Sequence, residues 1–206
     1  MFIIKFLTLH TMKKFASVVI LLLSFSFTLT SQISLEKKEM KPALLIIDTQ
    51  NAFMPMMSKE DHERAIQMMN YSLMMFRQLN LPIIRIYHSS AEYGVTPGTP
   101  GFEYPDSIQV KQEDLKVIKT YPSSFVKTDL DSLLKARDIN TLFLCGLSSV
   151  GCVLATYMDA FSYDYQAFMI KDAMLSHDAA YTNQIEGIFS ALDLETVMYL
   201  LEVAVR

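Results

Sequence analysis

Three side chains that could share one covalent reaction occur where predicted strands end and a predicted helix begins. Asp48 and Lys119 each close a predicted strand, and Cys152 opens a predicted helix after a third strand. A cysteine attacks as its thiolate, and an unperturbed pKa of about 8.5 leaves only a few per cent ionised at neutral pH. A helix N-terminus and a nearby ammonium both favour the thiolate. Asp48 could take the thiol proton and return it to a leaving group, while Lys119 keeps Asp48 ionised.

Each of the three residues also has an ordinary structural explanation. A cysteine at a helix start is commonly a small buried hydrophobic residue, an aspartate after a strand commonly caps a helix, and a lysine is commonly solvated. Ligands of parallel sheets gather outside the carboxyl ends of the strands. The shared location of all three residues at this edge therefore favours a catalytic role.

The elements that must position these residues alternate between strands and helices. Apolar runs predict six strands, over 44–47, 81–88, 115–119, 141–146, 166–170 and 196–201. Helical spacing of apolar residues and capping residues predict four helices, the first opened by Ser58 and running to Leu79, the others over 129–137, 149–163 and 179–192. This alternation predicts an α/β fold with a parallel sheet covered on both faces. The breaker-rich segment 89–113 predicts a long functional loop.

The first part of the chain is predicted to be a targeting segment. Met12 opens a basic stretch, and the uncharged run 16–30 follows it, so residues 1–31 have the layout of a signal peptide whose start could be Met12. A retained amphipathic anchor is the alternative. We expect a short linker over 32–42, one domain over 43–206, and a secreted or periplasmic location without stable membrane insertion after processing.

Charge and cysteine content exclude several classes of function. The net charge is −4, from 22 acidic and 18 basic residues without a basic stripe, which makes nucleic acid an unfavoured partner. Two cysteines, Cys145 and Cys152, are too few for a disulfide framework, and we expect both to be free thiols. A redox role is disfavoured because Cys-x-x-Cys is absent.

Four segments in order resemble the isochorismatase-like cysteine hydrolase family. They are Ala43–Phe53, Pro97–Glu103, Lys119–Phe125 and Gly146–Val153, the last followed by Thr156 and by Asp159-Ala160. Each segment is weak alone, but the ordered set covers nearly all of the chain from residue 43 to about residue 178. The resemblance implies a three-layer α/β sandwich with a Rossmann-like parallel central sheet, and it implies homo-oligomers.

The same resemblance implies roles for particular residues. It makes Asp48, Lys119 and Cys152 the catalytic residues. It also implies a cis peptide bond between Leu147 and Ser148, with the backbone N–H groups of Ser148 and Cys152 directed at a developing oxyanion. We expect a substrate pocket that includes Phe53, His88, Tyr121 and Phe125, although a strand-end histidine satisfied by backbone is an alternative for His88.

The reaction that these residues predict is hydrolysis of a small amide, ureide or related C–N bond through a thioester to Cys152. Hydrolysis of an isochorismate-type vinyl ether is the alternative within the enzymes, and a non-catalytic binding module is the alternative outside them. Nicotinamidases of this family hold a metal through an Asp-x-His pair, whereas residues 88–92 read His-Ser-Ser-Ala-Glu. We therefore predict no metal and no other cofactor, and a small-molecule substrate.

Overall fold

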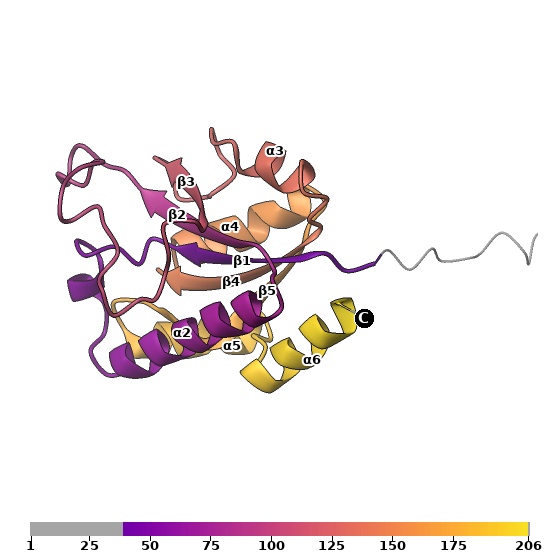
Figure 1. Cartoon of the computed structure of the whole chain (residues 1–206). Coiled ribbons are helices and arrows are strands. Elements are labelled where there is room, and N and C mark those ends of the chain that lie inside the picture. The colour runs from indigo at the N-terminus through magenta and orange to yellow at the C-terminus, as the bar shows by residue number, and fades with distance from the viewer. Residues whose placement is uncertain (1–38, 206) are drawn as a thin grey trace, which may run out of the picture. The chain divides into compact units, whose positions relative to one another are not determined.

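The computed structural model describes residues 39–205, which form a layered structure around one parallel sheet (Figure 1). The expected signal peptide and most of the expected linker lie outside these residues. The five strands are β1 (Pro42–Ile47), β2 (Ile83–His88), β3 (Leu115–Lys119), β4 (Thr141–Leu147) and β5 (Gln166–Leu175). They pair in the order β3-β2-β1-β4-β5, and every pair is parallel.

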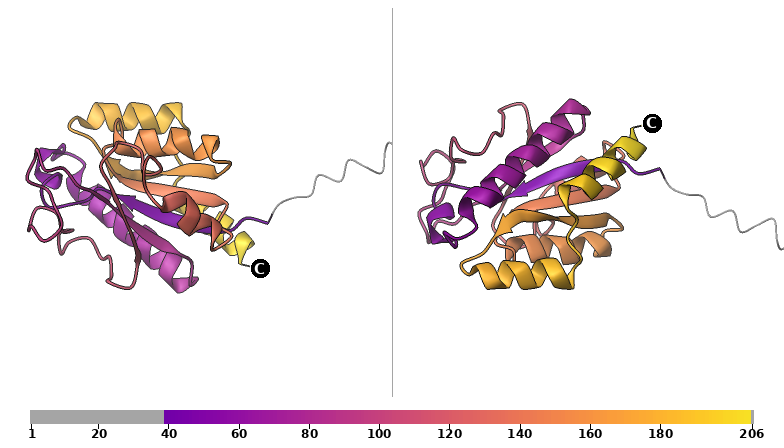
Figure 2. Two further views of the ribbon diagram at one scale, coloured as in Figure 1. Left: turned by 90° about the horizontal axis from the view of Figure 1, so that it is seen from above. Right: turned by 90° about the horizontal axis from the view of Figure 1, so that it is seen from below.

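Helices cover both faces of this sheet. They are α2 (His62–Gln78), α3 (Leu130–Lys135), α4 (Cys152–Ser162), α5 (Ala179–Ile188) and α6 (Leu194–Ala204), with a short 3-10 helix at Met54–Met56. Figure 2 shows α2 and α6 on one side of the sheet and α4 and α5 on the other. The expected three-layer α/β sandwich with a parallel central sheet is confirmed. Among residues 39–205, no helix combines the length and the apolar character needed to span a membrane.

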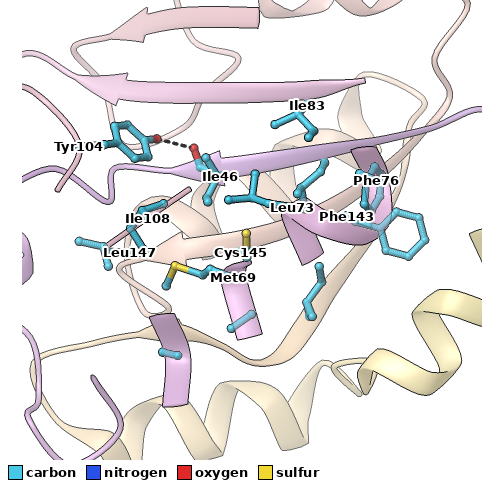
Figure 3. Packing of buried hydrophobic residues seen from close by; sticks show 14 of the residues in the cluster. Ile46, Met69, Leu73, Phe76, Ile83, Tyr104, Ile108, Phe143, Cys145 and Leu147 are labelled. Carbon is cyan, nitrogen blue, oxygen red and sulfur yellow. Dashed lines mark hydrogen bonds between the residues drawn. The ribbon is translucent and has the colours of Figure 1, made fainter. Parts of the chain in front are cut away.

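The core consists of two layers, one on each face of the sheet, and successive residues of β1 point into them alternately. Leu44 and Ile46 pack with residues of α2 and α6, whereas Ala43, Leu45 and Ile47 pack with residues of α3, α4 and α5. This division follows from the period of two along a strand. Figure 3 shows the first layer from close by, with Cys145 of β4 among its apolar side chains. A strand buried on both faces must be apolar throughout, which explains the unbroken run in β1.

One predicted strand is wrong. Residues 196–201 lie in helix α6, whose N-cap Asp193 accepts a hydrogen bond from the Thr196 N–H at 2.8 Å. Val197 and Leu201 are fully buried at a spacing of one helical turn, so tertiary packing uses a helical period where the apolar run suggested a strand. Ser58 is also not the cap of α2, which begins after Asp61, and β5 continues to Leu175.

The sheet order brings distant residues to one edge. β1 and β4 are neighbours although they are far apart in sequence, and β2 lies on the other side of β1. The chain reverses direction across the sheet between β1 and β4, and ligands of doubly wound sheets bind outside the carboxyl ends of the strands at such a point. Asp48 follows β1 and Cys152 follows β4, so these two residues flank the point between the two strands where the chain reverses direction.

Close backbone approach at this edge requires a glycine. Gly146, near the end of β4, has φ +114°, and a Cβ there would lie 2.2 Å from the Ile47 carbonyl oxygen. No real Cβ makes such a contact, and L side chains rarely adopt this backbone conformation. Gly146 therefore lets β4 pass close to the end of β1 beside Asp48.

Candidate active site

Asp48 and Lys119 form a buried ion pair at the carboxyl edge of the sheet. The Lys119 Nζ lies 2.7 Å from the Asp48 Oδ2, and the two side chains are 0% and 5% exposed. Lys119 ends β3 opposite His88 of β2, and its long side chain reaches past β2 to the end of β1. The Lys119 ammonium also lies 3.1 Å from the His88 Nδ1 and 3.2 Å from the Tyr121 carbonyl oxygen. It therefore has a partner for each of its three N–H donors.

Cys152 lies beside this pair at the first turn of α4. The chain reaches it from β4 through a cis peptide bond between Leu147 and Ser148. One atom each from Asp48, His88 and Cys152 lies within 4.8 Å of the other two. The structure thus brings together the three residues that the sequence singled out, with His88 as a fourth member.

Burial controls the protonation of the acidic groups in this cluster. It raises the pKa of the Asp48 carboxyl above its usual range, against the opposing effect of the Lys119 ammonium. Burial and the Asp48 carboxylate raise the pKa of the Cys152 thiol to about 12. The Lys119 ammonium favours the thiolate, as expected, but desolvation and the Asp48 carboxylate outweigh its effect on the pKa of the thiol. Cys152 rests as a thiol beside a carboxylate that can accept its proton.

His88 is neutral at physiological pH. Burial and the Lys119 ammonium both lower the pKa of the His88 imidazole. An ammonium has only donors, so the Nδ1 that faces it accepts, and the ring proton resides on Nε2. The His88 ring also packs edge-on against Phe53, with centroids 5.9 Å apart. A histidine ring satisfied by backbone is therefore not what the structure contains, because its side-chain partner is Lys119.

Two backbone N–H groups beside Cys152 are unused. Other donors of this turn are paired: the Ser149 N–H donates to the Leu175 carbonyl, and the Gly151 and Val153 N–H groups donate to the Ser148 carbonyl. Within residues 39–205, the N–H groups of Ser148 and Cys152 donate none of the backbone hydrogen bonds found. Both are thus available to an anionic oxygen.

A cavity of about 180 Å³ opens onto the cluster. Its walls are formed by both site residues and apolar side chains: Asp48, Phe53, Met57, His88, Tyr93, Leu147, Ser148 and Cys152. Of the expected pocket residues, Phe53 and His88 line this cavity.

The other two expected pocket residues lie elsewhere. Phe125 is buried in the core, where its ring stacks on Tyr163 with centroids 4.7 Å apart. Tyr121 is 39% exposed, and its hydroxyl accepts a hydrogen bond from Lys127. Neither residue lines this cavity. Tyr121 contributes to the site only through its backbone carbonyl, which accepts from Lys119.

Sequence reasoning missed Gln50, which clamps the site. Its fully buried side chain donates to the His88 and Phe102 carbonyls and accepts from the His88 N–H at 2.7 Å. These bonds fix the end of β2 and tie the long loop after it to β1. The sequence feature that could have revealed Gln50 is its position just after the unbroken apolar strand that ends at Ile47. A polar side chain buried at such a position must have hydrogen-bond partners.

Asp48, His88 and Cys152 also form a set of ligand types that could hold a metal ion. Two of these residues already contact the Lys119 ammonium, through the Asp48 Oδ2 and the His88 Nδ1. Lys119 therefore already supplies a positive charge beside both of these residues. The prediction of a metal-independent site is consistent with this geometry and stays a prediction.

Comparisons with known proteins identify the family. The family model described as "Isochorismatase domain" matches residues 42–193. The chain is 31% identical over 152 residues to the isochorismatase family protein YddQ of Bacillus subtilis (strain 168), covering 71% of this chain and 82% of that protein. It is 37% identical over 76 residues to the ureidoacrylate amidohydrolase RutB of Agrobacterium fabrum, covering 37% of this chain and 33% of that protein.

Among solved structures, the chain is similar to N-carbamoylsarcosine amidase from Thermoplasma acidophilum. The TM-score is 0.64 at 26% identity, and the match covers 75% of this chain and 95% of that one. Together with the family model and the similarity to YddQ, this likeness shows that the chain belongs to the isochorismatase family of hydrolases.

Proposed function

We propose that the protein hydrolyses the C–N bond of a small amide or ureide through a thioester to Cys152. The observation that carries this proposal is that the Cys152 thiol and the Asp48 carboxylate line one cavity, with the Lys119 ammonium paired to that carboxylate. Two similar proteins, RutB and N-carbamoylsarcosine amidase, have names that describe amide hydrolysis, which supports the same bond type here.

In the first step, Asp48 takes the thiol proton as the Cys152 sulfur attacks the carbonyl carbon of the substrate. This order is required because the pKa of the thiol is about 12, so little thiolate exists before substrate binds. The carbonyl oxygen becomes an oxyanion, for which the free N–H groups of Ser148 and Cys152 are the available donors. Asp48 then gives the proton to the nitrogen, and the C–N bond breaks to release ammonia or an amine.

In the second step, a water molecule attacks the thioester carbon, and Asp48 takes one of its protons. The tetrahedral intermediate collapses with loss of the Cys152 sulfur, which regains a proton from Asp48, and the acid product leaves. The Lys119 ammonium stabilises the Asp48 carboxylate, whose pKa burial would otherwise raise further.

The experiment that tests this proposal compares two cysteine variants over a panel of small amides and ureides. The wild-type protein should release ammonia or amine, the Cys152→Ala variant should release none above background, and the Cys145→Ala variant should retain turnover. Cys145 is a matched control because it is a second free thiol, buried in the core on β4.

The same variants separate the alternatives. Hydrolysis of an isochorismate-type vinyl ether need not use the thiol, so ether turnover that survives in Cys152→Ala would favour that reaction. A non-catalytic module predicts no turnover of any compound. It also predicts that iodoacetamide labels Cys152 no faster than Cys145 at pH 7.

A further inference from the structure

The cavity at the site contains little that could neutralise a charged substrate. Its apolar walls come from four side chains, Phe53, Met57, Tyr93 and Leu147. The charged residue among its lining is Asp48, and no lysine or arginine lines it within the described part of the chain. The remaining polar lining residues, His88, Ser148 and Cys152, carry no positive charge in the resting state.

The buried cation next to the cavity is already fully engaged. Lys119 is 0% exposed, and its three N–H donors face the Asp48 carboxylate, the His88 ring and the Tyr121 carbonyl. It therefore has no donor left for a carboxylate on the substrate. A substrate carboxylate in this cavity would lie near the Asp48 carboxylate without a cation of its own, which is costly in a desolvated site.

The size of the cavity limits the substrate as well. A volume of about 180 Å³ is below the roughly 300–1,000 Å³ of pockets for drug-sized ligands. The cavity therefore fits a ligand smaller than a drug-sized molecule.

Resting on the proposed function, we propose that the substrates are small uncharged amides whose acyl part is apolar, and that the cavity rejects amides bearing a carboxylate. The apolar acyl part lies against Phe53, Met57 and Leu147, while the amide carbonyl faces Cys152 and the unused N–H groups. Tyr93, which is 67% exposed, lines the cavity from the long loop after β2.

The test uses a matched pair of amides that differ in charge and hardly in shape. 4-Methylpentanamide and succinamate share the chain between the amide and a branched end, which is two methyl groups in the first and a carboxylate in the second. We expect kcat/KM for 4-methylpentanamide to exceed that for succinamate by at least about 100-fold, since a carboxylate left unpaired in a desolvated site costs several kcal/mol.

A variant of the apolar wall provides the second arm. Met57 lines the cavity and is partly exposed, so an arginine there can extend its charge into the cavity. Met57→Arg should narrow the preference for 4-methylpentanamide by about tenfold or more, and the uncharged control Met57→Leu should keep it. The wild-type ratio is decisive by itself if Met57→Arg does not fold.

The outcomes separate this inference from the proposed function. Equal or faster hydrolysis of succinamate, with the acyl group found on Cys152 by mass spectrometry, overturns the uncharged substrate class and leaves the thioester reaction intact. Hydrolysis of neither amide, together with no acylation of Cys152 by any amide of the wider panel, overturns the proposed function and this inference with it.

Discussion

Removing the Lys119 ammonium should expose how strongly the fold depends on charge compensation at Asp48. The substitution Lys119→Met keeps the length of the side chain but leaves the buried carboxylate without its cation. At an effective dielectric constant of about 20, two unit charges 2.7 Å apart attract with about 6 kcal/mol. Desolvation offsets much of that attraction in the intact pair, but breaking a buried pair by removing one partner costs about 3–5 kcal/mol.

The loss should depend on pH in a defined direction. Burial raises the pKa of Asp48 in the folded protein, so the folded state holds this proton more tightly than the unfolded state. Such a group favours folding at low pH, and the contribution is lost as pH rises through the folded pKa. Lys119→Met removes the largest effect that opposes this rise. The stability gap between variant and wild type should therefore be small near pH 5 and approach about 3–5 kcal/mol by pH 8.

The assay is urea unfolding of both proteins at pH 5 and pH 8, with two controls. Lys116→Met removes an exposed lysine from the same strand, where the ammonium lies 4.3 Å from the centroid of the Tyr87 ring, and should cost about 1 kcal/mol or less at both pH values. Lys119→Met combined with Asp48→Asn should lose the pH dependence. A stability gap below about 1 kcal/mol at pH 8, or one that is equal at both pH values, would show that Lys119 does not compensate a buried Asp48 carboxylate.

Three further outcomes follow from the geometry. Gly146→Ala should destabilise the protein by more than about 2 kcal/mol in the same unfolding assay, because Gly146 has a positive φ and the added Cβ would meet the Ile47 carbonyl. A neutral result would mean that β4 does not approach β1 so closely. Iodoacetamide should label Cys152 in the native protein at a rate that still rises between pH 8 and pH 10, because the pKa of this thiol is about 12. A labelling rate that reaches a plateau near pH 8.5 would contradict that pKa. Dialysis against a chelator should leave amide turnover unchanged, whereas a loss restored by Zn²⁺ would show that Asp48, His88 and Cys152 hold a metal after all.

The strands of the sheet could be predicted because they are clear apolar runs in the sequence. β1 is a run of apolar residues buried on both faces, and β3 begins and ends at the predicted residues 115 and 119. The carboxyl ends of these strands then placed Asp48, Lys119 and Cys152 at one edge without knowledge of the strand order. The strand predicted over residues 196–201 was wrong because a short apolar run fits both a strand and the buried face of a helix. In the structure these residues form a helix that packs against α2 and β5.

The rest of the site depends on contacts that no local pattern contains. Phe125 is the last residue of the segment that begins with Lys119, yet its ring packs in the core against Tyr163 and Tyr165. Tyr93 lines the cavity from a loop without regular structure, between Ser90 and Val95, which form an isolated bridge. The raised pKa of the Cys152 thiol also depends on burial, whose extent could not be predicted from a helix start alone.

The measurement that bears most directly on the cooperation of the three residues is mass spectrometry of a quenched reaction. With the amide of the panel that is hydrolysed fastest, the wild-type protein should carry the acyl group on the peptide that contains Cys152. Asp48 has φ +54°, a conformation that asparagine also tolerates, so Asp48→Asn should keep the backbone. In this variant Cys152 should be acylated about 10²–10⁴-fold more slowly than in the wild type. Turnover without any acyl group on Cys152, or acylation of Asp48→Asn at the wild-type rate, would contradict a reaction carried by Asp48, Lys119 and Cys152 together.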